Sequence, residues 1–212
     1  MTIRPATTAD APFLAWVILT AARSHLPRGW FDIVLDRPER DCLEFLTRLA
    51  VTEARSWWHY SRFYVAEVDG AAAAALCAFH GDDPYVQSGA AMAEVVTGYG
   101  GSATFDLDAI WARGSYIFTC TFEPAGDVWT IENVATLPQY RKRGLAGELI
   151  KHVLPEGKRL GRHEAQITFL IGNDAAAHAY ANAGFEFFGE KRSPEFEAAT
   201  GSPGLCRYVK RL

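Results

Sequence analysis

One short basic turn constrains this chain more than any other feature. The run 141–146, Arg-Lys-Arg-Gly-Leu-Ala, follows a β-rich segment at 129–136 and precedes a segment with helical spacing. A helix N-terminus carries backbone N–H groups without partners and a partial positive charge, so this arrangement suits a phosphate group. The turn lacks both the Walker P-loop pattern and the Gly-x-Gly-x-x-Gly pattern of dinucleotide folds. The sequence therefore predicts a diphosphate ligand of another kind.

Length and composition indicate a globular protein. The 212 residues are 49% hydrophobic and 22% charged, which is typical of a chain that buries a core without disulfides or metals. We predict a single domain over residues 1–212, in which about 81–114 is either an insertion or an elaborated crossover. The net charge of −4 and the lack of a long basic face argue against nucleic acid as a partner.

The cysteines and histidines show no pattern of a metal site. Cys42, Cys77, Cys120 and Cys206 are far apart, and the six histidines include no His-x-x-x-His pair. We expect four reduced thiols in or near the core and no metal. The N-terminus lacks an apolar signal segment, and the longest apolar stretch is too short to span a bilayer. We therefore expect a cytoplasmic protein with no membrane partner.

Hydrophobic periodicity predicts a mixture of strands and helices. Asp69-Gly70 is the strongest hairpin signal, residues 24–36 read as a loop, and Gly126 marks a turn at 124–127. The expected strands are 3–5, 63–68, 71–79, 116–122, 129–136, 164–171, 185–190 and 206–212. The expected helices are 7–23, a long second helix with an apolar stripe from Cys42 to Trp57, short helices near 90–96 and 107–112, then 145–160 and 175–183. The last of these is expected to be capped by Asn173 or Asp174.

Two longer patterns point to a family. Residues 131–147 read Ile-Glu-Asn-Val-Ala-Thr-Leu-Pro-Gln-Tyr-Arg-Lys-Arg-Gly-Leu-Ala-Gly, and residues 173–185 read Asn-Asp-Ala-Ala-Ala-His-Ala-Tyr-Ala-Asn-Ala-Gly-Phe. The first resembles the acyl-CoA motif of the GNAT superfamily of N-acetyltransferases, Gln/Arg-x-x-Gly-x-Gly/Ala. The second is similar to the family's following helix, Asn-x-x-Ala-x-x-x-Tyr-x-x-x-Gly-Phe. The resemblance is good over 129–190, loose over 3–79 and absent over 81–114.

The resemblance implies a fold, a reaction and a cofactor site. The fold would be α/β, with a mixed, mostly antiparallel sheet flanked by helices on both faces and a V-shaped split for acyl-CoA. The reaction would transfer acetyl from acetyl-CoA to a primary amine of a small molecule or peptide. The residues thereby assigned to the cofactor are Val134, Thr136, Arg141, Lys142, Arg143, Gly144, Leu145, Ala146, Gly147 and Asn173.

Amine acylation needs a proton donor for the leaving thiolate and a base for the ammonium. The resemblance carries the donor role onto Tyr180, whose phenol has a reference pKa near ~10. Some relatives place a glutamate on the strand after the cofactor helix, where this chain has Thr168. Glu132 is the best substitute because its neighbours are apolar and a buried carboxylate needs a purpose or a partner. It serves as a base, holds the substrate ammonium, or is an ordinary strand glutamate.

Other features leave alternatives open. The aromatic run Trp57-Trp58-His59-Tyr60 either lines the acceptor pocket or packs in the core. A non-catalytic acyl-CoA sensor would keep the same basic turn, and so would a nucleotide-binding protein. The acceptor is not specified, because the segments expected to form its walls match no family pattern. A homodimer is compatible with the sequence.

Overall fold

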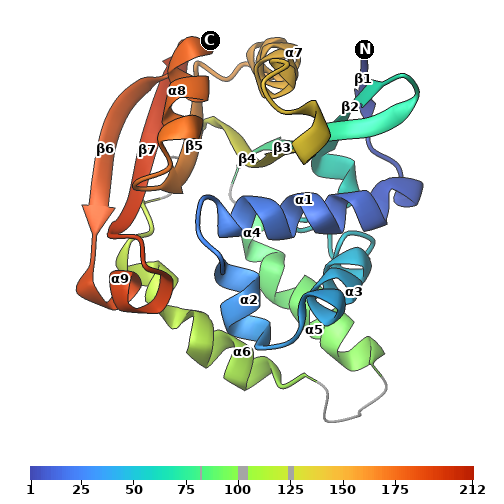
Figure 1. The fold of residues 1–212 in the computed structure, drawn as a ribbon, viewed down its shortest axis with the longest axis vertical. Coiled ribbons are helices and arrows are strands. Elements are labelled where there is room, and N and C mark those ends of the chain that lie inside the picture. Colours follow the sequence, from blue (N-terminus) through green and yellow to red (C-terminus); the bar gives the residue numbers. More distant parts are fainter. Residues whose placement is uncertain (82, 100–104, 124–126) are drawn as a thin grey trace.

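The computed structural model describes residues 1–81, 83–99, 105–123 and 127–212. In these residues seven strands form one sheet in the order β1-β2-β3-β4-β5-β7-β6 (Figure 1). Neighbouring strands are antiparallel except for β4 and β5, which are parallel. The strands are β1 (Thr2–Pro5), β2 (Phe63–Val68), β3 (Ala71–His80), β4 (Trp129–Thr136), β5 (Glu164–Leu170), β6 (Glu186–Arg192) and β7 (Gly204–Arg211).

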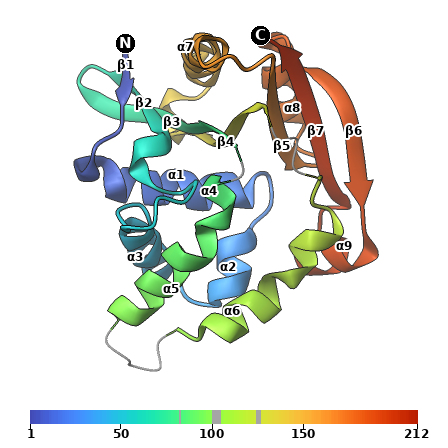
Figure 2. The same ribbon diagram turned by 180° about the vertical axis from the view of Figure 1, so that it is seen from behind.

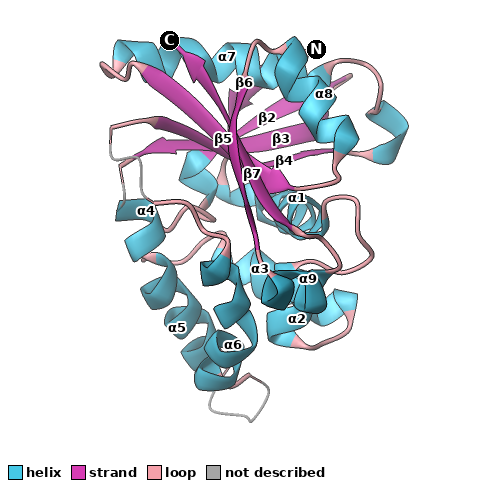
Figure 3. Ribbon diagram, turned by 90° about the vertical axis from the view of Figure 1, so that its left-hand side faces the viewer, coloured by secondary structure: helices cyan, strands magenta, loops and turns pink. Residues whose placement is uncertain are grey.

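Helices cover both faces of the sheet (Figure 3). On one face, α7 (Leu145–Arg159) and α8 (Asp174–Asn182) enclose one apolar cluster. On the other face lies a second and larger cluster. The helices that contribute to this second cluster are α1 (Ala11–Arg23), α2 (Trp30–Leu35), α3 (Glu39–Leu49), α5 (Ser88–Gly98) and α6 (Leu107–Gly114). The predicted mixed sheet with helices on both faces is confirmed.

The alanine-rich strand β3 lies in the middle of the β1–β4 half of the sheet. Its residues from Ala73 to Phe79 are buried on both faces. Alanine has a weak strand preference, but here the flanking strands and helices decide the conformation. The small side chains let α7 and α1 approach the sheet from opposite sides, and both helices contact β3. The predicted hairpin at Asp69-Gly70 joins β2 to β3, with both residues at positive φ.

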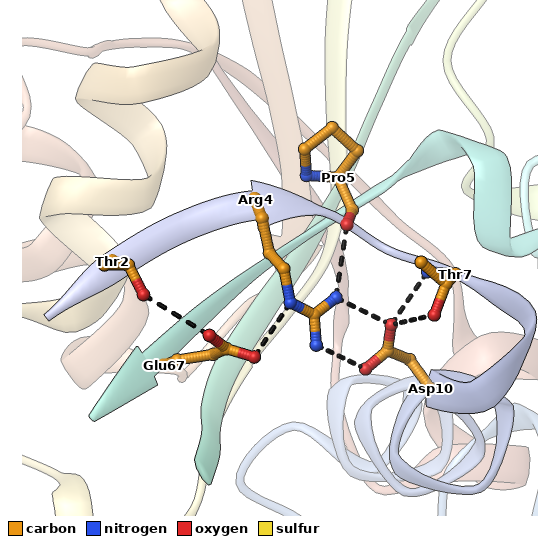
Figure 4. A network of polar contacts seen from close by, with 6 residues as sticks. All are labelled: Thr2, Arg4, Pro5, Thr7, Asp10 and Glu67. Atoms are coloured by element: carbon orange, nitrogen blue, oxygen red, sulfur yellow. Dashed lines mark hydrogen bonds and ion pairs between the residues drawn. The ribbon is translucent and has the colours of Figure 1, made fainter. Parts of the chain in front are cut away.

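An ionic network joins the first strand to the first helix (Figure 4). The Arg4 guanidinium donates to both carboxylate oxygens of Asp10 at 2.8 and 2.9 Å and to Glu67 at 2.8 Å. Asp10 also accepts the backbone N–H of Thr7 at 2.7 Å. The network therefore connects β1, β2 and the turn that leads into α1.

The prediction of a strand at 116–122 is wrong. Residues Ser115–Thr119 form a 3-10 helix instead. The buried side chains of this segment, Tyr116 and Cys120, are four residues apart, which is a helical spacing. They pack against Phe196 of α9 (Pro194–Thr200), a helix that the sequence patterns did not indicate.

Two further predictions near the N-terminus differ from the structure, one about a loop and one about the end of a helix. The region 24–36, predicted as a loop, contains α2, whose entry requires Gly29 because a Cβ there would lie 2.3 Å from the Ala22 backbone. The second helix, predicted to run to Trp57, ends at Leu49. The Thr52 hydroxyl donates to the Leu49 carbonyl at 3.1 Å and satisfies part of that helix end.

Most described residues of the segment at 81–114 are helical (Figure 2). The segment contains α4 (Asp83–Val86), α5 and α6, so the two short helices predicted there are confirmed. The turn predicted at 124–127 lies almost entirely outside the described residues.

All four cysteines are free and buried, as expected. Among the described residues, no helix combines the length and apolar character needed to cross a bilayer.

Candidate active site

The sheet splits between its two parallel strands. β4 and β5 pair only through Trp129–Ile131 and Ala165–Ile167, and then they separate. The Gln166 side chain donates to the Thr130 hydroxyl at 3.0 Å at the base of this split. A cavity of about 1310 Å³ opens above it, lined by residues of both strands. The predicted V-shaped split is therefore present, and the cavity is large enough for two substrates.

A β-bulge shapes the wall of the split on the β4 side. Asn133 has φ 51°, and the pairing with β3 changes register there, because Glu132 lies opposite Cys77 but Ala135 lies opposite Ala75. A bulge leaves one residue outside the ladder and exposes backbone groups that a regular strand would pair. Val134 lines the cavity at this point, and the buried Asn133 Nδ2 has no hydrogen-bond partner.

The basic turn forms the start of α7, as the sequence predicts. Gly144 is the N-cap residue with φ 77°, and no side chain caps the helix. The first helical hydrogen bond runs from the Glu148 N–H to the Gly144 carbonyl at 3.0 Å. The N–H groups of residues 145–147 precede this bond and have no partner within the helix. They are therefore available to an anion at the cavity wall.

Open space lies in front of these donors. A Cβ added at Gly144 or Gly147 would meet no atom within 4 Å, and both glycines line the cavity. Arg141 and Lys142 also line it, and the Arg141 Nε donates to the Thr136 carbonyl at 3.3 Å. The turn thus joins two features that a diphosphate needs, which are unpaired amides and nearby positive charge.

α8 contributes two of the predicted residues from the opposite side of the split. Asn173 caps the helix as expected, since its Oδ1 accepts the Ala176 N–H at 3.1 Å. Its Nδ2 donates to the Ser24 hydroxyl at 2.6 Å and so connects α8 to the end of α1. Both residues line the cavity, so this bond joins two parts of the cavity wall that are far apart in the chain.

Tyr180 lines the cavity from the next turns of α8. Its ring packs edge-on against Phe169 at 5.2 Å, and no described residue hydrogen-bonds its hydroxyl. Burial raises the pKa of Tyr180 well above its ordinary value of 10, and the negative charge of Glu132 raises it further. The phenol is therefore protonated at neutral pH and has a free O–H to donate.

Glu132 lies on β4, directly below the bulge, and faces the same cavity. Burial raises the pKa of its carboxyl to about 8. A hydrogen bond from the Tyr85 hydroxyl at 3.2 Å and the positive charge of Arg207 each lower that pKa in part. No cation among the described residues forms an ion pair with Glu132. A carboxyl group that titrates near neutral pH inside a cleft is well suited to proton transfer.

Aromatic side chains form the rest of the cavity wall. Trp57 and Trp58 both line it, and Trp58 stacks on Trp30 at 6.1 Å. Tyr85 packs against Trp57 at 5.4 Å. His59 and Tyr60 do not line the cavity, and burial of His59 lowers its pKa to about 4. The aromatic run at 57–60 is therefore divided between pocket and core.

Comparison with known proteins agrees with this architecture. The model of the Acetyltransferase (GNAT) family matches residues 30–185, which is more than half of the chain. The chain belongs to the GNAT acetyltransferase family. No curated protein matches the sequence.

Solved structures resemble this GNAT enzyme over nearly its whole length. A crystal structure of an acetyltransferase has a TM-score of 0.71 at 18% identity and covers 100% of this chain and 99% of its own. An N-acetyltransferase from Staphylococcus aureus Mu50 has a TM-score of 0.69 at 19% identity and covers 99% and 100%. A Salmonella typhimurium protein, solved with its cofactor acetyl-CoA, has a TM-score of 0.54 at 15% identity and covers 100% and 94%. At these identities the likeness establishes the shared fold.

The fold of this GNAT enzyme brings most of the predicted site residues to one cavity. Those that line it are Glu132, Val134, Thr136, Arg141, Lys142, Gly144, Leu145, Ala146, Gly147, Asn173 and Tyr180. Arg143 is the exception, because its guanidinium lies over the Tyr140 ring at 5.3 Å and it does not line the cavity. Sequence reasoning missed Tyr85, Asn133 and Arg207. Tyr85 lies in the 81–114 segment, where the sequence shows no recognised motif, and no local pattern marks a bulge or the register of β7.

Proposed function

We propose that this GNAT enzyme transfers an acetyl group from acetyl-CoA to the primary amine of a small molecule or peptide. The observation that carries the proposal is the single cavity that contains the α7 N-terminus, Tyr180 and Glu132 together. This cavity offers an anion site, a proton donor and a titrating carboxyl group, which are the three requirements of amine acylation. Solved relatives in complex with coenzyme A or acetyl-CoA support the choice of acyl donor.

The residues present fit the donor. The N–H groups of residues 145–147 would bind the diphosphate, with Arg141 and Lys142 supplying positive charge. The free backbone beside the bulge, at Val134 and Thr136, would hydrogen-bond the extended pantetheine arm as an added strand does. Asn173 would contact the same arm from α8. We retain Arg143 only as a contributor of charge outside the cavity, since its side chain lies over Tyr140.

The chemical steps follow from the two titratable groups. Ionised Glu132, directly or through a water, would take a proton from the substrate ammonium, and the free amine would attack the thioester carbonyl carbon. Backbone N–H groups near Val134 would stabilise the negative charge that develops on the carbonyl oxygen. When the carbon–sulfur bond breaks, Tyr180 would donate its proton to the thiolate, and the excess proton on the attacking nitrogen would pass to the resulting tyrosinate, directly or through water. The products would be an N-acetyl amide and coenzyme A.

The acid assignment is tested by Tyr180→Phe. General acid catalysis contributes roughly a hundredfold or more, so thiol release from acetyl-CoA with an accepted amine should fall by at least about that factor. Coenzyme A binding, measured by calorimetry, should be retained. An unchanged turnover rate in a folded variant would rule out Tyr180 as the acid.

A matched control is available in the same cluster. The Tyr208 ring also packs against Phe169, at 5.1 Å, but Tyr208 does not line the cavity. Tyr208→Phe also removes a phenolic hydroxyl, but one outside the cavity, and should leave turnover unchanged. A protein that binds coenzyme A tightly and releases no thiol with a broad amine panel would instead be an acyl-CoA sensor.

The setting of the reaction is also a proposal. Four free, buried cysteines are consistent with a reducing cytoplasm. We further propose that residues 1–212 act as one catalytic domain, since the 81–114 segment contributes Tyr85 to the site rather than forming a separate unit.

A further inference from the structure

Arg207 is a cation inside the cavity that the proposed mechanism does not use. It lies on β7 and lines the cavity, where its guanidinium stacks on the Phe122 ring at 4.5 Å. One terminal nitrogen donates to the Glu123 carbonyl at 3.4 Å, and Nε is buried without a partner. Among the described residues no carboxylate pairs with Arg207. Burial of an unpaired guanidinium is costly, and it lowers the pKa of Arg207.

Arg207 and Glu132 lie in the same row across the sheet. Thr130 is opposite Gln166, and Thr168 is opposite Arg207, so strand alternation places Glu132, Thr168 and Arg207 on one face. All three line the cavity. The Cα atoms of Glu132 and Arg207 are two strand spacings apart, or roughly 10 Å plus the opening of the split. Both side chains are long, and Arg207 is close enough for its charge to lower the pKa of Glu132.

The two charges therefore face each other across a space with room for a small molecule. Glu132 matches an ammonium group, and the unused donors of Arg207 match a carboxylate, which a guanidinium binds with two parallel hydrogen bonds. The surrounding wall is aromatic, with Trp57, Tyr85 and Phe122 among its members. Such a wall favours a large apolar group between the two charged ends.

We infer that the acceptor is a free α-amino acid with a large apolar side chain, held by its carboxylate at Arg207 while its amino group meets Glu132. This inference rests on the proposed function and names the substrate class of the same site. Arg207 is thereby a substrate-binding residue that sets specificity, and Phe122 holds its guanidinium in place.

The test compares phenylalanine with two probes that lack its carboxylate, phenethylamine and phenylalaninamide. Thiol release from acetyl-CoA gives kcat/KM for each probe. We expect phenylalanine to be preferred by roughly 10- to 100-fold, which is the usual value of a charge-assisted hydrogen-bond pair. In Arg207→Gln that preference should vanish. The readout is the ratio of kcat/KM for phenylalanine to that for phenethylamine, because the lost charge also raises the pKa of Glu132 and affects both rates alike. Arg207→Lys keeps the positive charge but loses the paired guanidinium donors. Its preference for phenylalanine should lie between those of the parent protein and Arg207→Gln.

Lys191 supplies the matched control. It also lies over the Phe122 ring, at 5.6 Å, and donates to the Thr121 carbonyl at 2.8 Å, but it does not line the cavity. Lys191→Gln removes a second cation that contacts the 121–123 loop and should leave the probe preference unchanged. If Lys191→Gln and Arg207→Gln lower the rates of all probes alike, Arg207 only supports the loop and the inference is wrong.

The outcomes separate this inference from the proposed function. Equal use of phenethylamine and phenylalanine, or a preference for phenylalaninamide, overturns the role of Arg207 and leaves amine acetylation standing. Turnover of amines outside this set, with none for phenylalanine or tryptophan, has the same meaning. Absence of thiol release with every amine overturns both proposals.

Discussion

At the scale of single residues, the most informative group is the Glu132 carboxyl. Its pKa is raised to about 8 by burial, and only the Tyr85 hydroxyl and the more distant Arg207 counteract that shift. A base works best when its pKa is near the working pH, because it then combines availability with driving force. The raised pKa thus makes this glutamate better matched to an ammonium than an ordinary glutamate would be.

This pKa predicts a pH profile. Glu132 accepts a proton only when ionised, so kcat/KM should rise with pH and level off above about 8. Glu132→Gln should lower the plateau by roughly a hundredfold or more and abolish the rise. Tyr85→Phe removes a hydrogen bond that lowers this pKa, so its rise should move to higher pH. A rise that stays in Glu132→Gln at the same pH belongs to the amine substrate instead.

Stability supplies an independent check on the same group. The folded protein holds the Glu132 proton more tightly than the unfolded chain, whose ordinary value is 4.5. The contribution of this proton to the stability of the folded protein is therefore complete below pH 4.5 and is lost as the pH rises through about 8. Glu132→Gln should consequently melt no lower than the parent protein at pH 9, even though its turnover should fall by roughly a hundredfold or more.

At the scale of elements, α7 performs two tasks with two glycines. Gly147 faces open space at the cavity, whereas Gly157 faces the sheet, where an added Cβ would lie 2.6 Å from Trp129 Cγ. Neither glycine has a positive φ, so backbone conformation does not require either of them. One leaves room for a ligand and the other leaves room for the strand.

Alanine at these two positions should act in opposite directions. Gly147→Ala should stabilise the fold by up to about 1 kcal/mol through helix propensity but weaken coenzyme A binding roughly tenfold, because its methyl group occupies the ligand's space. Gly157→Ala gains the same propensity yet should destabilise by about 1–3 kcal/mol through the clash with Trp129. Urea unfolding and calorimetry measure the two effects. Unchanged coenzyme A affinity in Gly147→Ala would place the diphosphate elsewhere.

Several elements were predictable because short-range spacing decides them. The hairpin at Asp69-Gly70, the basic turn before α7 and the Asn173 cap each depend on a few neighbouring residues. The segment at 116–122 was mispredicted because its aromatic residues alternate as in a strand. Its burial is instead set by contact with Phe196, which is about 80 residues away and lies on a helix that the local pattern did not reveal.

At the scale of the whole molecule, the Arg4 network joins the N-terminal strand to the sheet and to α1. Hydrogen bonds from Arg4 and Thr7 lower the pKa of the buried Asp10 carboxyl to about 2, against an ordinary 3.8. Because the pKa is depressed on folding, the stabilisation is present above about 4 and is lost as the pH falls towards 2.

Acid titration of stability tests this network. Asp10→Asn should cost about 2 kcal/mol of unfolding free energy at pH 7, and the difference from the parent protein should vanish near pH 2. As a control, Glu190→Gln breaks the exposed Glu190–Arg192 pair and should cost less than about 1 kcal/mol. Equal effects of the two substitutions would show that the Asp10 network is no stronger than a surface ion pair.

The sequence by itself determined the family, the position of the basic turn before α7 and the α8 cap, because each of these depends on residues that are close together in the chain. Only the tertiary structure decided what surrounds Glu132. Tyr85 comes from the 81–114 segment, which carries no recognised motif, and Arg207 comes from a strand near the C-terminus. The fold of the chain and the order and register of the sheet bring both residues to one cavity. Sheet register depends on packing across the whole molecule, so no local pattern can reveal it.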